Sequence, residues 1–217
     1  MYEVTRDSTD VDFDFATSVK LGPNVNHDGG DGYGKISSDG LTLIYGSSRP
    51  GGAGGTDVWT ATRASRTDPF DPAVNLAQVN TEYGDATPFL SSDGLALFFN
   101  STRPGGFGDP EAFNGGSDLY VSYRDDVSAP WQEPVNLGPD VNSAAGAWSP
   151  MLSADGSTLY FTSTRSSGIP NHLDFPEWVP VMDFYQVSVS PVPEPTSAAL
   201  AAIALALLGC VAWRKRR

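Results

Sequence analysis

Carboxylates recur at fixed distances behind a repeated asparagine. Two and five residues after that asparagine come Asp28 and Asp31 in one copy, and Glu82 and Asp85 in the next. Paired carboxylates beside backbone carbonyls are the oxygen ligands that Ca²⁺ prefers. The pattern predicts a calcium site at these four residues. The alternative is ordinary exposed acidic turns, because neither loop has EF-hand spacing and a third copy carries alanine at both positions.

Groups that could carry out catalysis are scarce. His27 and His172 are the two histidines of the chain, and neither lies in a GxSxG or HExxH motif. We therefore expect a non-enzymatic protein that needs no cofactor apart from the calcium just described. The alternative is a hydrolase of extracellular glycans that uses the same loop carboxylates.

Aromatic side chains gather in one loop of each copy, and this loop lengthens along the chain. It spans residues 50–56, then 104–117, then 166–182. Lengthening at one scaffold position is typical of binding loops. The longer loops hold the candidate ligand contacts, which suit sugar stacking or a protein partner: Phe107, Phe113, His172, Phe175 and Trp178. The alternative is that these side chains fill the small cores of their own loops.

Composition limits both the fold and the partners. Glycine (23) and proline (17) are abundant and charged residues make up 18 %, which favours an all-β class with many tight turns. The length of 217 residues predicts one folded unit plus appendages. A net charge of −13 repels nucleic acid and anionic lipid, so no nucleic-acid partner is expected. The single cysteine, Cys210, excludes an intrachain disulfide.

The chain contains three copies of a repeat about 55–60 residues long. Each copy has an Asp-Gly pair, an arginine ten residues after that aspartate and an asparagine thirteen residues before it. The pairs begin at Asp39, Asp93 and Asp155, the arginines are Arg49, Arg103 and Arg165, and the asparagines are Asn26, Asn80 and Asn142. The Asp-Gly pairs predict tight hairpin turns. The arginines are expected to bond turn carboxylates or carbonyls, and the asparagines to tie down their own loops.

Four short strands can be read in each unit, as in a propeller blade. In the second copy they are Phe70–Leu76, Thr87–Leu90, Leu95–Asn100 and Asp118–Arg124. The third copy ends at its third strand, near residues 184–190. Residues 15–22 read as a fourth strand without a blade, which permits closure of the last blade. A closed ring, an open arc and the end of a longer propeller all remain open.

Together, S-x-DG, LxFxSxR, a glycine-rich loop and DLYVS resemble the WD-like repeats of the Tol-Pal system's periplasmic propeller. The resemblance covers about residues 13–190, divided as 13–71, 72–132 and 133–190, after a leader (1–12) that we expect to be disordered or truncated. It implies an all-β propeller of about three four-stranded blades that binds proteins or ligands.

The C-terminus carries a second signal. Pro193-Glu194-Pro195 precedes an uncharged, Ala- and Leu-rich stretch over 196–213 and a basic end at 214–217. The stretch predicts a transmembrane helix. Its anchoring residues are Leu200, Leu205, Leu208, Trp213, Arg214, Lys215, Arg216 and Arg217. The basic end predicts a cytoplasmic C-terminus, with the body outside the membrane.

This arrangement over residues 191–217 resembles the PEP-CTERM sorting signal, which implies processing by a membrane exosortase. Export would need a signal peptide, and none is visible after Met1. We expect a cell-surface or matrix-associated bacterial protein, released or attached after processing, that binds envelope polysaccharide or another surface protein. A truncated propeller fragment without independent activity is the further alternative.

Overall fold

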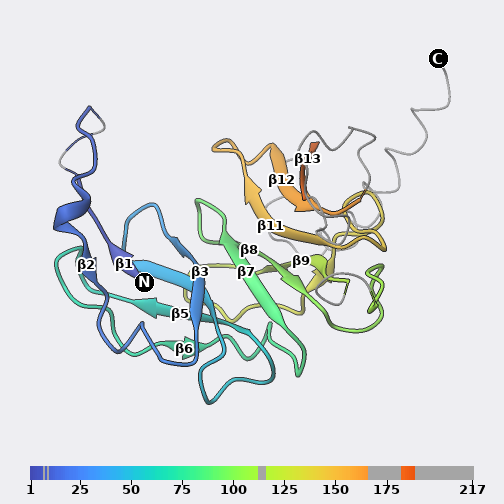
Figure 1. Cartoon of the computed structure of the whole chain (residues 1–217), viewed down its shortest axis with the longest axis horizontal. Helices are drawn as coiled ribbons and strands as arrows, with labels where there is room; N and C mark the ends of the chain where they lie inside the picture. The colour runs from blue at the N-terminus through green and yellow to red at the C-terminus, as the bar shows by residue number, and fades with distance from the viewer. Residues whose placement is uncertain (7, 9, 112–115, 166–181, 189–217) are drawn as a thin grey trace, which may run out of the picture. The chain divides into compact units, whose positions relative to one another are not determined.

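The computed structural model describes residues 1–6, 8, 10–111, 116–165 and 182–188. Within these ranges it contains thirteen strands and one short 3-10 helix (Figure 1). The predicted all-β class is confirmed. No helix in the described part of the chain is long and apolar enough to cross a membrane. The predicted membrane helix, residues 196–213, lies outside that part.

The chain divides into two compact units, Met1–Pro88 and Phe89–Arg217, where the sequence predicts one. Three sheets, which we call the repeat sheets, correspond to the three sequence copies. In each of them the strands lie side by side in the order in which they occur along the chain. The first contains β3 (Asp31–Ile36), β4 (Thr42–Ser47), β5 (Asp57–Thr62) and β6 (Val74–Asn75). The second contains β7 (Asp85–Leu90), β8 (Ala96–Ser101), β9 (Asp118–Tyr123) and β10 (Val135–Asn136). The third contains β11 (Ala147–Leu152), β12 (Thr158–Ser163) and β13 (Asp183–Ser188).

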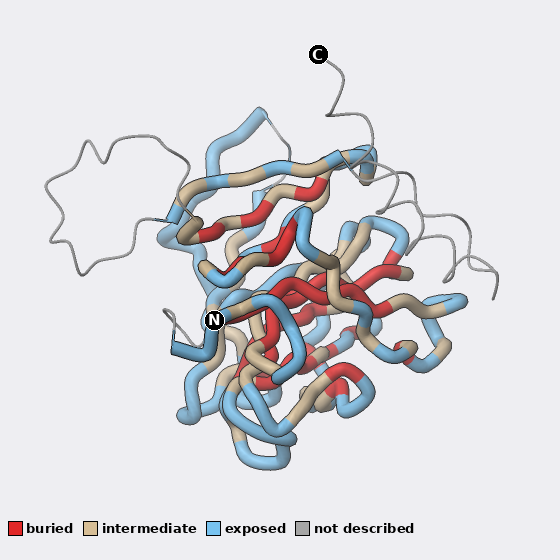
Figure 2. The backbone as a smooth tube through the Cα atoms, turned by 90° about the vertical axis from the view of Figure 1, so that its right-hand side faces the viewer, coloured by how far each residue is buried: buried red, intermediate tan, exposed pale blue. Residues whose placement is uncertain are grey.

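The middle strands carry the core because their apolar runs are buried on both faces. In β4 and β8 every residue from Leu43 to Ser47 and from Ala96 to Ser101 is buried, whereas the connecting loops are mostly exposed (Figure 2). The core of the first unit consists of Val25, Leu43, Tyr45, Trp59, Ala61 and Phe70. The core of the second unit joins two repeat sheets and consists of Ala96, Phe98, Leu119, Val121, Val141, Ala147, Leu159 and Phe161.

The Asp-Gly pairs form the predicted turns between the first two strands of each repeat sheet. Gly94 has φ 74°, a left-handed conformation that glycine adopts without strain. The carboxylate of Asp93 accepts hydrogen bonds from the hydroxyl of Ser91 (2.6 Å) and the amide of Leu95 (2.9 Å). The other two copies repeat this arrangement. The turn residues are therefore structural.

The carboxylate of Asp155 accepts three hydrogen bonds within its turn. Hydrogen bonds from the Ser153 hydroxyl and from the amide and hydroxyl of Ser157 lower the pKa of Asp155 to about 2. A lowered folded-state pKa stabilises the fold above the unfolded value near 3.8, and this stabilisation is lost as the pH falls towards 2. We expect Asp155→Asn to lower Tm slightly at pH 5–7, with the difference from the unmodified chain shrinking between about pH 4 and pH 2. Thermal melts across this range measure it. Asp140→Asn removes an exposed carboxylate and serves as the charge-matched control, and a gap independent of pH would contradict the prediction.

The N-terminus departs from the prediction. The expected leader contributes β1 (Tyr2–Glu3), and the expected strand over 15–22 shortens to β2 (Val19–Lys20) after a 3-10 turn (Phe15–Thr17). β2 pairs with β1, with Tyr2 opposite Lys20, and the described residues show no pairing of β2 with the third repeat sheet. The physical reason is that β1 is a partner close in sequence, which costs little loop-closure entropy.

Candidate functional site

The repeated asparagine forms a clamp on the strand before it. Asn142, which is 1 % exposed, accepts a hydrogen bond from the amide of Leu119 (2.8 Å) and donates to its carbonyl (2.9 Å). Asn80 makes the same two bonds with Val58 (2.8 and 2.9 Å). Asn26 makes them with Met1. Each asparagine also bonds within its own loop, as predicted, but the longer-range clamp could be seen only in three dimensions.

The repeated arginine lies over aromatic rings of its own sheet. The guanidinium of Arg49 is 5.1 Å from the ring of Tyr45 and 5.2 Å from that of Trp59. It donates to the carboxylate of Asp31 (2.7 Å) and to the carbonyl of Val25. Stacking of the same kind recurs at Arg103 and Arg165. The predicted role in bonding carboxylates and carbonyls is confirmed for Arg49.

The four predicted calcium ligands do not gather. Asp31 pairs with Arg49 and accepts from the amide of His27 (2.5 Å), while Asp28 and Glu82 are exposed. Burial opposes ionisation of Asp31, but these bonds and that of Ser47 outweigh it and lower its pKa. Asp85 is fully buried and accepts from the amide and hydroxyl of Thr81 (2.6 and 2.8 Å). Within the described ranges no three acidic, histidine or cysteine side chains lie close enough to share a metal, and calcium stays a prediction.

The third copy shows what Asp31 and Asp85 do for their loops. Ala147 replaces the aspartate there, and the hydroxyl of Ser143, four residues earlier, is buried without a hydrogen-bond partner. Ser143 corresponds to Thr81, which bonds Asp85. These aspartates therefore fasten the loops that enter the first and second repeat sheets.

Two buried aspartates at the start of the third strands hold the glycine-rich loops. Asp57 accepts from the amide of Ala53 (2.6 Å) and Asp118 from that of Phe107 (2.6 Å). A Cβ atom on Gly52 would lie 1.8 Å from an Asp57 oxygen, so only glycine fits beside it. Burial raises the pKa of Asp57, and the charge of Asp85 adds to this effect. Sequence reasoning missed this role, although an aspartate after each glycine-rich loop was the available signal.

Phe107 is the predicted ligand contact that the structure describes. Its amide is fixed to Asp118, while its side chain is 45 % exposed. The ring thus stands on a loop whose backbone is held by a buried carboxylate. Phe113, His172, Phe175 and Trp178 lie outside the described residues, as do the sorting motif and the anchor.

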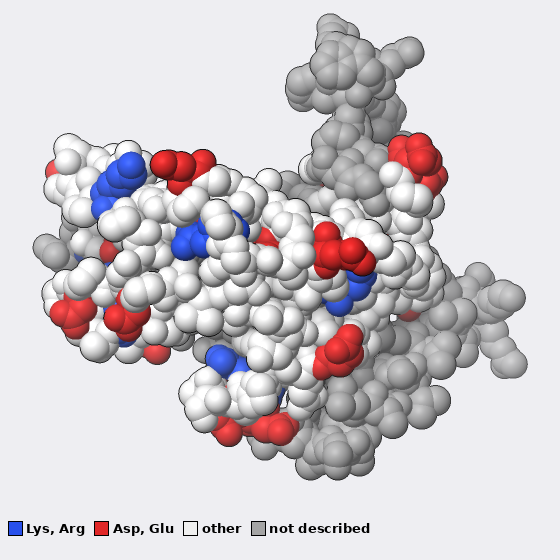
Figure 3. Space-filling view, turned by 90° about the horizontal axis from the view of Figure 1, so that it is seen from below, with Lys and Arg blue, Asp and Glu red and all other residues white. Residues whose placement is uncertain are grey.

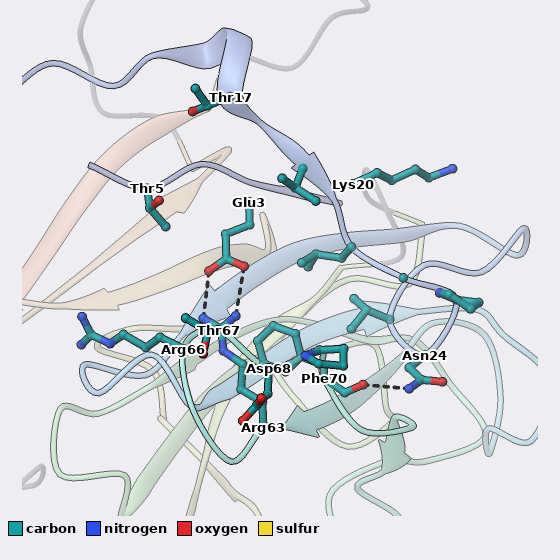
Figure 4. Close-up of a pocket in the computed structure, with 16 residues that line it drawn as sticks. Glu3, Thr5, Thr17, Lys20, Asn24, Arg63, Arg66, Thr67, Asp68 and Phe70 are labelled. Atoms are coloured by element: carbon teal, nitrogen blue, oxygen red, sulfur yellow. Dashed lines mark hydrogen bonds and ion pairs between the residues drawn. The ribbon is translucent and has the colours of Figure 1, made fainter. Parts of the chain in front are cut away.

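A cavity of about 410 Å³ lies in the first unit, between the N-terminal strands and the loop after β5 (Figure 4). Glu3 forms two bonds to Arg63 at its centre (3.0 and 2.8 Å), and Asn24 donates to the carbonyl of Phe70 (2.7 Å). The Arg63 guanidinium also lies 4.5 Å from the ring of Phe70. The charge of Arg63 is therefore neutralised by Glu3. The remaining lining residues are a mixture of charged, polar and apolar side chains.

The arginine at the end of the third strand is a second repeated feature that sequence reasoning missed. Arg124 lies 4.4 Å over Trp131, and Arg6 lies 4.6 Å over Phe13. Both repeat the stacking of Arg63 on Phe70, with a spacing of seven residues. Phe13 therefore takes the place near the N-terminus that Phe70 and Trp131 take in the later copies. An Arg-x₆-aromatic search would have found it.

Charged side chains are scattered on the face drawn in Figure 3, among broad uncharged areas. Basic and acidic groups alternate there without forming one large patch of either sign.

The C-terminus gives the deciding comparison. Residues 191–217 match the PEP-CTERM protein-sorting motif. This confirms the sorting signal predicted from Pro193-Glu194-Pro195 and the segment after it. The PEP-CTERM motif implies an exported, envelope-associated protein that is processed by exosortase.

Solved structures similar to this chain include a putative TolB from Agrobacterium tumefaciens, at 23 % identity and a TM-score of 0.40. They also include the tricorn protease, at 14 % identity and a TM-score of 0.41. The matches cover 59 % and 81 % of this chain, but only 36 % and 15 % of the two neighbours. No curated protein matches the chain.

Proposed function

We propose that this protein is an exported, non-enzymatic β-propeller protein that binds neutral envelope polysaccharide. The observation that carries the proposal is Phe107, an aromatic ring left 45 % exposed on a loop whose backbone is fixed by buried Asp118. A rigidly held, exposed aromatic face is what stacking on a sugar ring requires. Another surface protein is the alternative partner, because exposed aromatic side chains are also typical hot spots of protein–protein interfaces.

The repeat sheets support the propeller reading. In the described residues, two of them have four strands in chain order and the third has three. Each has the same Asp-Gly turn and the same stacked arginine. Four-stranded sheets of this kind are propeller blades. In this reading the glycine-rich loops and the loops that enter each first strand emerge on one face.

The uses found for the acidic side chains favour binding over hydrolysis. Asp31 is ion-paired with Arg49 and Asp85 bonds Thr81, so both serve the scaffold. A glycoside hydrolase needs two carboxyl groups facing one substrate bond.

In this proposal the residues before the sorting signal lie outside the membrane. The helix over 196–213 holds them there, with the basic end in the cytoplasm, until exosortase removes the tail.

The experiment compares ring removal at two exposed positions. Full-length protein in detergent micelles is titrated with laminarin, a neutral glucan, by isothermal calorimetry. Phe107→Ala should weaken binding about tenfold, the effect of losing one hot-spot aromatic. Phe15→Ala, which removes a 74 % exposed ring outside the glycine-rich loops, should leave binding unchanged. Equal affinity of the Phe107 variant, or release of reducing sugar ends from the glucan, would overturn the proposal.

A further inference from the structure

A second aromatic ring, Tyr83, is exposed on a loop that lies against a glycine-rich loop. Its side chain is 40 % exposed, close to the 45 % of Phe107. It belongs to residues 81–84, which enter the second repeat sheet and which we call the entering loop of that sheet. The residues at the same distance after the clamp asparagine in the other two copies are Gly29 and Ala145. Among the three entering loops, this position therefore carries a ring in the second copy alone.

The backbone of this entering loop is fastened to a buried aspartate. Asp85 is 0 % exposed and accepts from the amide and the hydroxyl of Thr81 (2.6 and 2.8 Å). The Thr81 hydroxyl in turn accepts a hydrogen bond from the amide of Tyr83 (3.3 Å). Tyr83 thus has the property on which the proposal for Phe107 rests, an exposed ring on a backbone that a buried carboxylate holds.

The glycine-rich loop of the first repeat sheet supports the entering loop from the other side. A Cβ atom on Gly54 would lie 2.1 Å from the carbonyl oxygen of Glu82, so the two backbones are in direct contact. A Cβ atom on Gly55 would lie 3.7 Å from the Cα atom of Gly84. All these residues belong to the first unit. Both sequence neighbours of Tyr83 are therefore packed against another loop, which fixes the position of its backbone.

The second unit repeats this contact between a glycine-rich loop and an entering loop. The amide of Asp109, in the glycine-rich loop, donates to the carbonyl of Ala144 (3.2 Å). Ala144 lies two residues after its clamp asparagine, as Glu82 does in the first unit. The two units therefore present the same pair of loops, in contact at the same place.

The exposed ring comes from a different loop in each unit. The amides of Ala53 and Phe107 make the same bond to a buried aspartate, so these two residues occupy equivalent places in their glycine-rich loops. In the first unit this place holds alanine, and the entering loop supplies Tyr83. In the second unit it holds phenylalanine, and the entering loop has Ala145. In the described residues, each pair of loops thus carries one large exposed aromatic side chain.

We propose that Tyr83 is the stacking platform of a second binding site for neutral polysaccharide. This inference rests on the proposed function and extends it from one site to two. A tyrosine ring offers a flat face for a sugar ring and a hydroxyl that can bond a sugar hydroxyl. The exposed carboxylate of the adjacent Glu82 accepts from sugar hydroxyls but repels the acid group of an anionic sugar. The site therefore favours neutral glycans.

Fluorine NMR of the full-length protein in detergent micelles tests contact at Tyr83 directly. Labelling with 3-fluorotyrosine places one fluorine label on each of the eight tyrosines, and Tyr83→Phe identifies the Tyr83 resonance by its loss. Addition of laminarin should shift this resonance until the site is saturated. The resonance of Tyr2, a 68 % exposed ring outside these loops, is the control and should not move.

Calorimetry with the same glucan tests whether the ring contributes to affinity. In the Phe107→Ala background the remaining binding is expected at Tyr83. Adding Tyr83→Ala should therefore weaken it about tenfold further, the effect of losing one hot-spot aromatic. Tyr2→Ala in the same background removes an exposed tyrosine elsewhere and should leave the remaining binding unchanged.

The outcomes separate this inference from the proposed function. A Tyr83 resonance that stays in place while Phe107→Ala weakens binding would overturn the second site and leave the proposed function intact. Equal shifts of Tyr83 and Tyr2 would likewise overturn the second site. A shift of Tyr83 alone, with unchanged affinity in Phe107→Ala, would support the second site and overturn the role of Phe107. Absence of any binding to laminarin would overturn both.

Discussion

Replacement of Asn142 by alanine is expected to destabilise the second unit by about 2–4 kcal/mol. The Asn142 side chain bonds both backbone groups of Leu119 and the side-chain oxygen of Asn136 (2.9 Å). Leu119 is 0 % exposed, so water cannot replace the lost partners. Each buried group left without a partner costs roughly 1–3 kcal/mol. Because Leu119 belongs to the core of its unit, the loss should also spread to its packing neighbours.

Urea unfolding of the full-length protein, followed by tryptophan fluorescence, measures this loss. Asn24→Ala is the matched control, because Asn24 is exposed and makes one bond to the Phe70 carbonyl. Its cost should stay below about 1 kcal/mol. A loss at Asn142 no larger than that of the control would show that the clamp is not a stabilising joint.

Replacement of Pro193-Glu194-Pro195 by three alanines is expected to abolish processing of the chain. The sorting motif matched over residues 191–217 implies recognition by exosortase. Without the Pro-Glu-Pro sequence the tail should remain attached, and the protein should accumulate as an unprocessed, envelope-bound precursor. Pulse-chase labelling with an antibody to the body of the protein distinguishes precursor from product by size.

Pro191→Ala is the control for this experiment, because it changes a nearby proline outside the Pro-Glu-Pro sequence. It should leave the rate of processing close to that of the unmodified chain. Normal processing of the triple-alanine variant would contradict the assignment of these three residues as the recognition element.

The asparagine clamp gives the repeats their connection. It joins a loop of one copy to the third strand of the copy before it, so each sheet depends on its neighbour in sequence. Nearest-neighbour dependence of this kind is typical of repeat proteins. Phe184, at the clamped position of the third repeat sheet, is 81 % exposed in the described part of the chain.

Local features of this protein could be predicted from the sequence because they depend on nearby residues. Strands over Thr87–Leu90 and Leu95–Asn100 are confirmed within two residues, since apolar runs between Asp-Gly turns have few alternatives. The sorting motif is confirmed for the same reason, because its recognition depends on linear order.

The tertiary structure decided which partner each polar side chain uses. Nothing in the spacing of Asp31 distinguishes a calcium ligand from the ion-pair partner of Arg49, because both roles need an ionised carboxylate. The pairing of β2 with β1 was likewise open in the sequence, because the residues of a short strand do not by themselves specify its partner. The repeat, the turns and the sorting signal follow from the sequence alone. The asparagine clamps and the aspartates that hold the glycine-rich loops could not be predicted, because they depend on contacts between residues far apart in the chain.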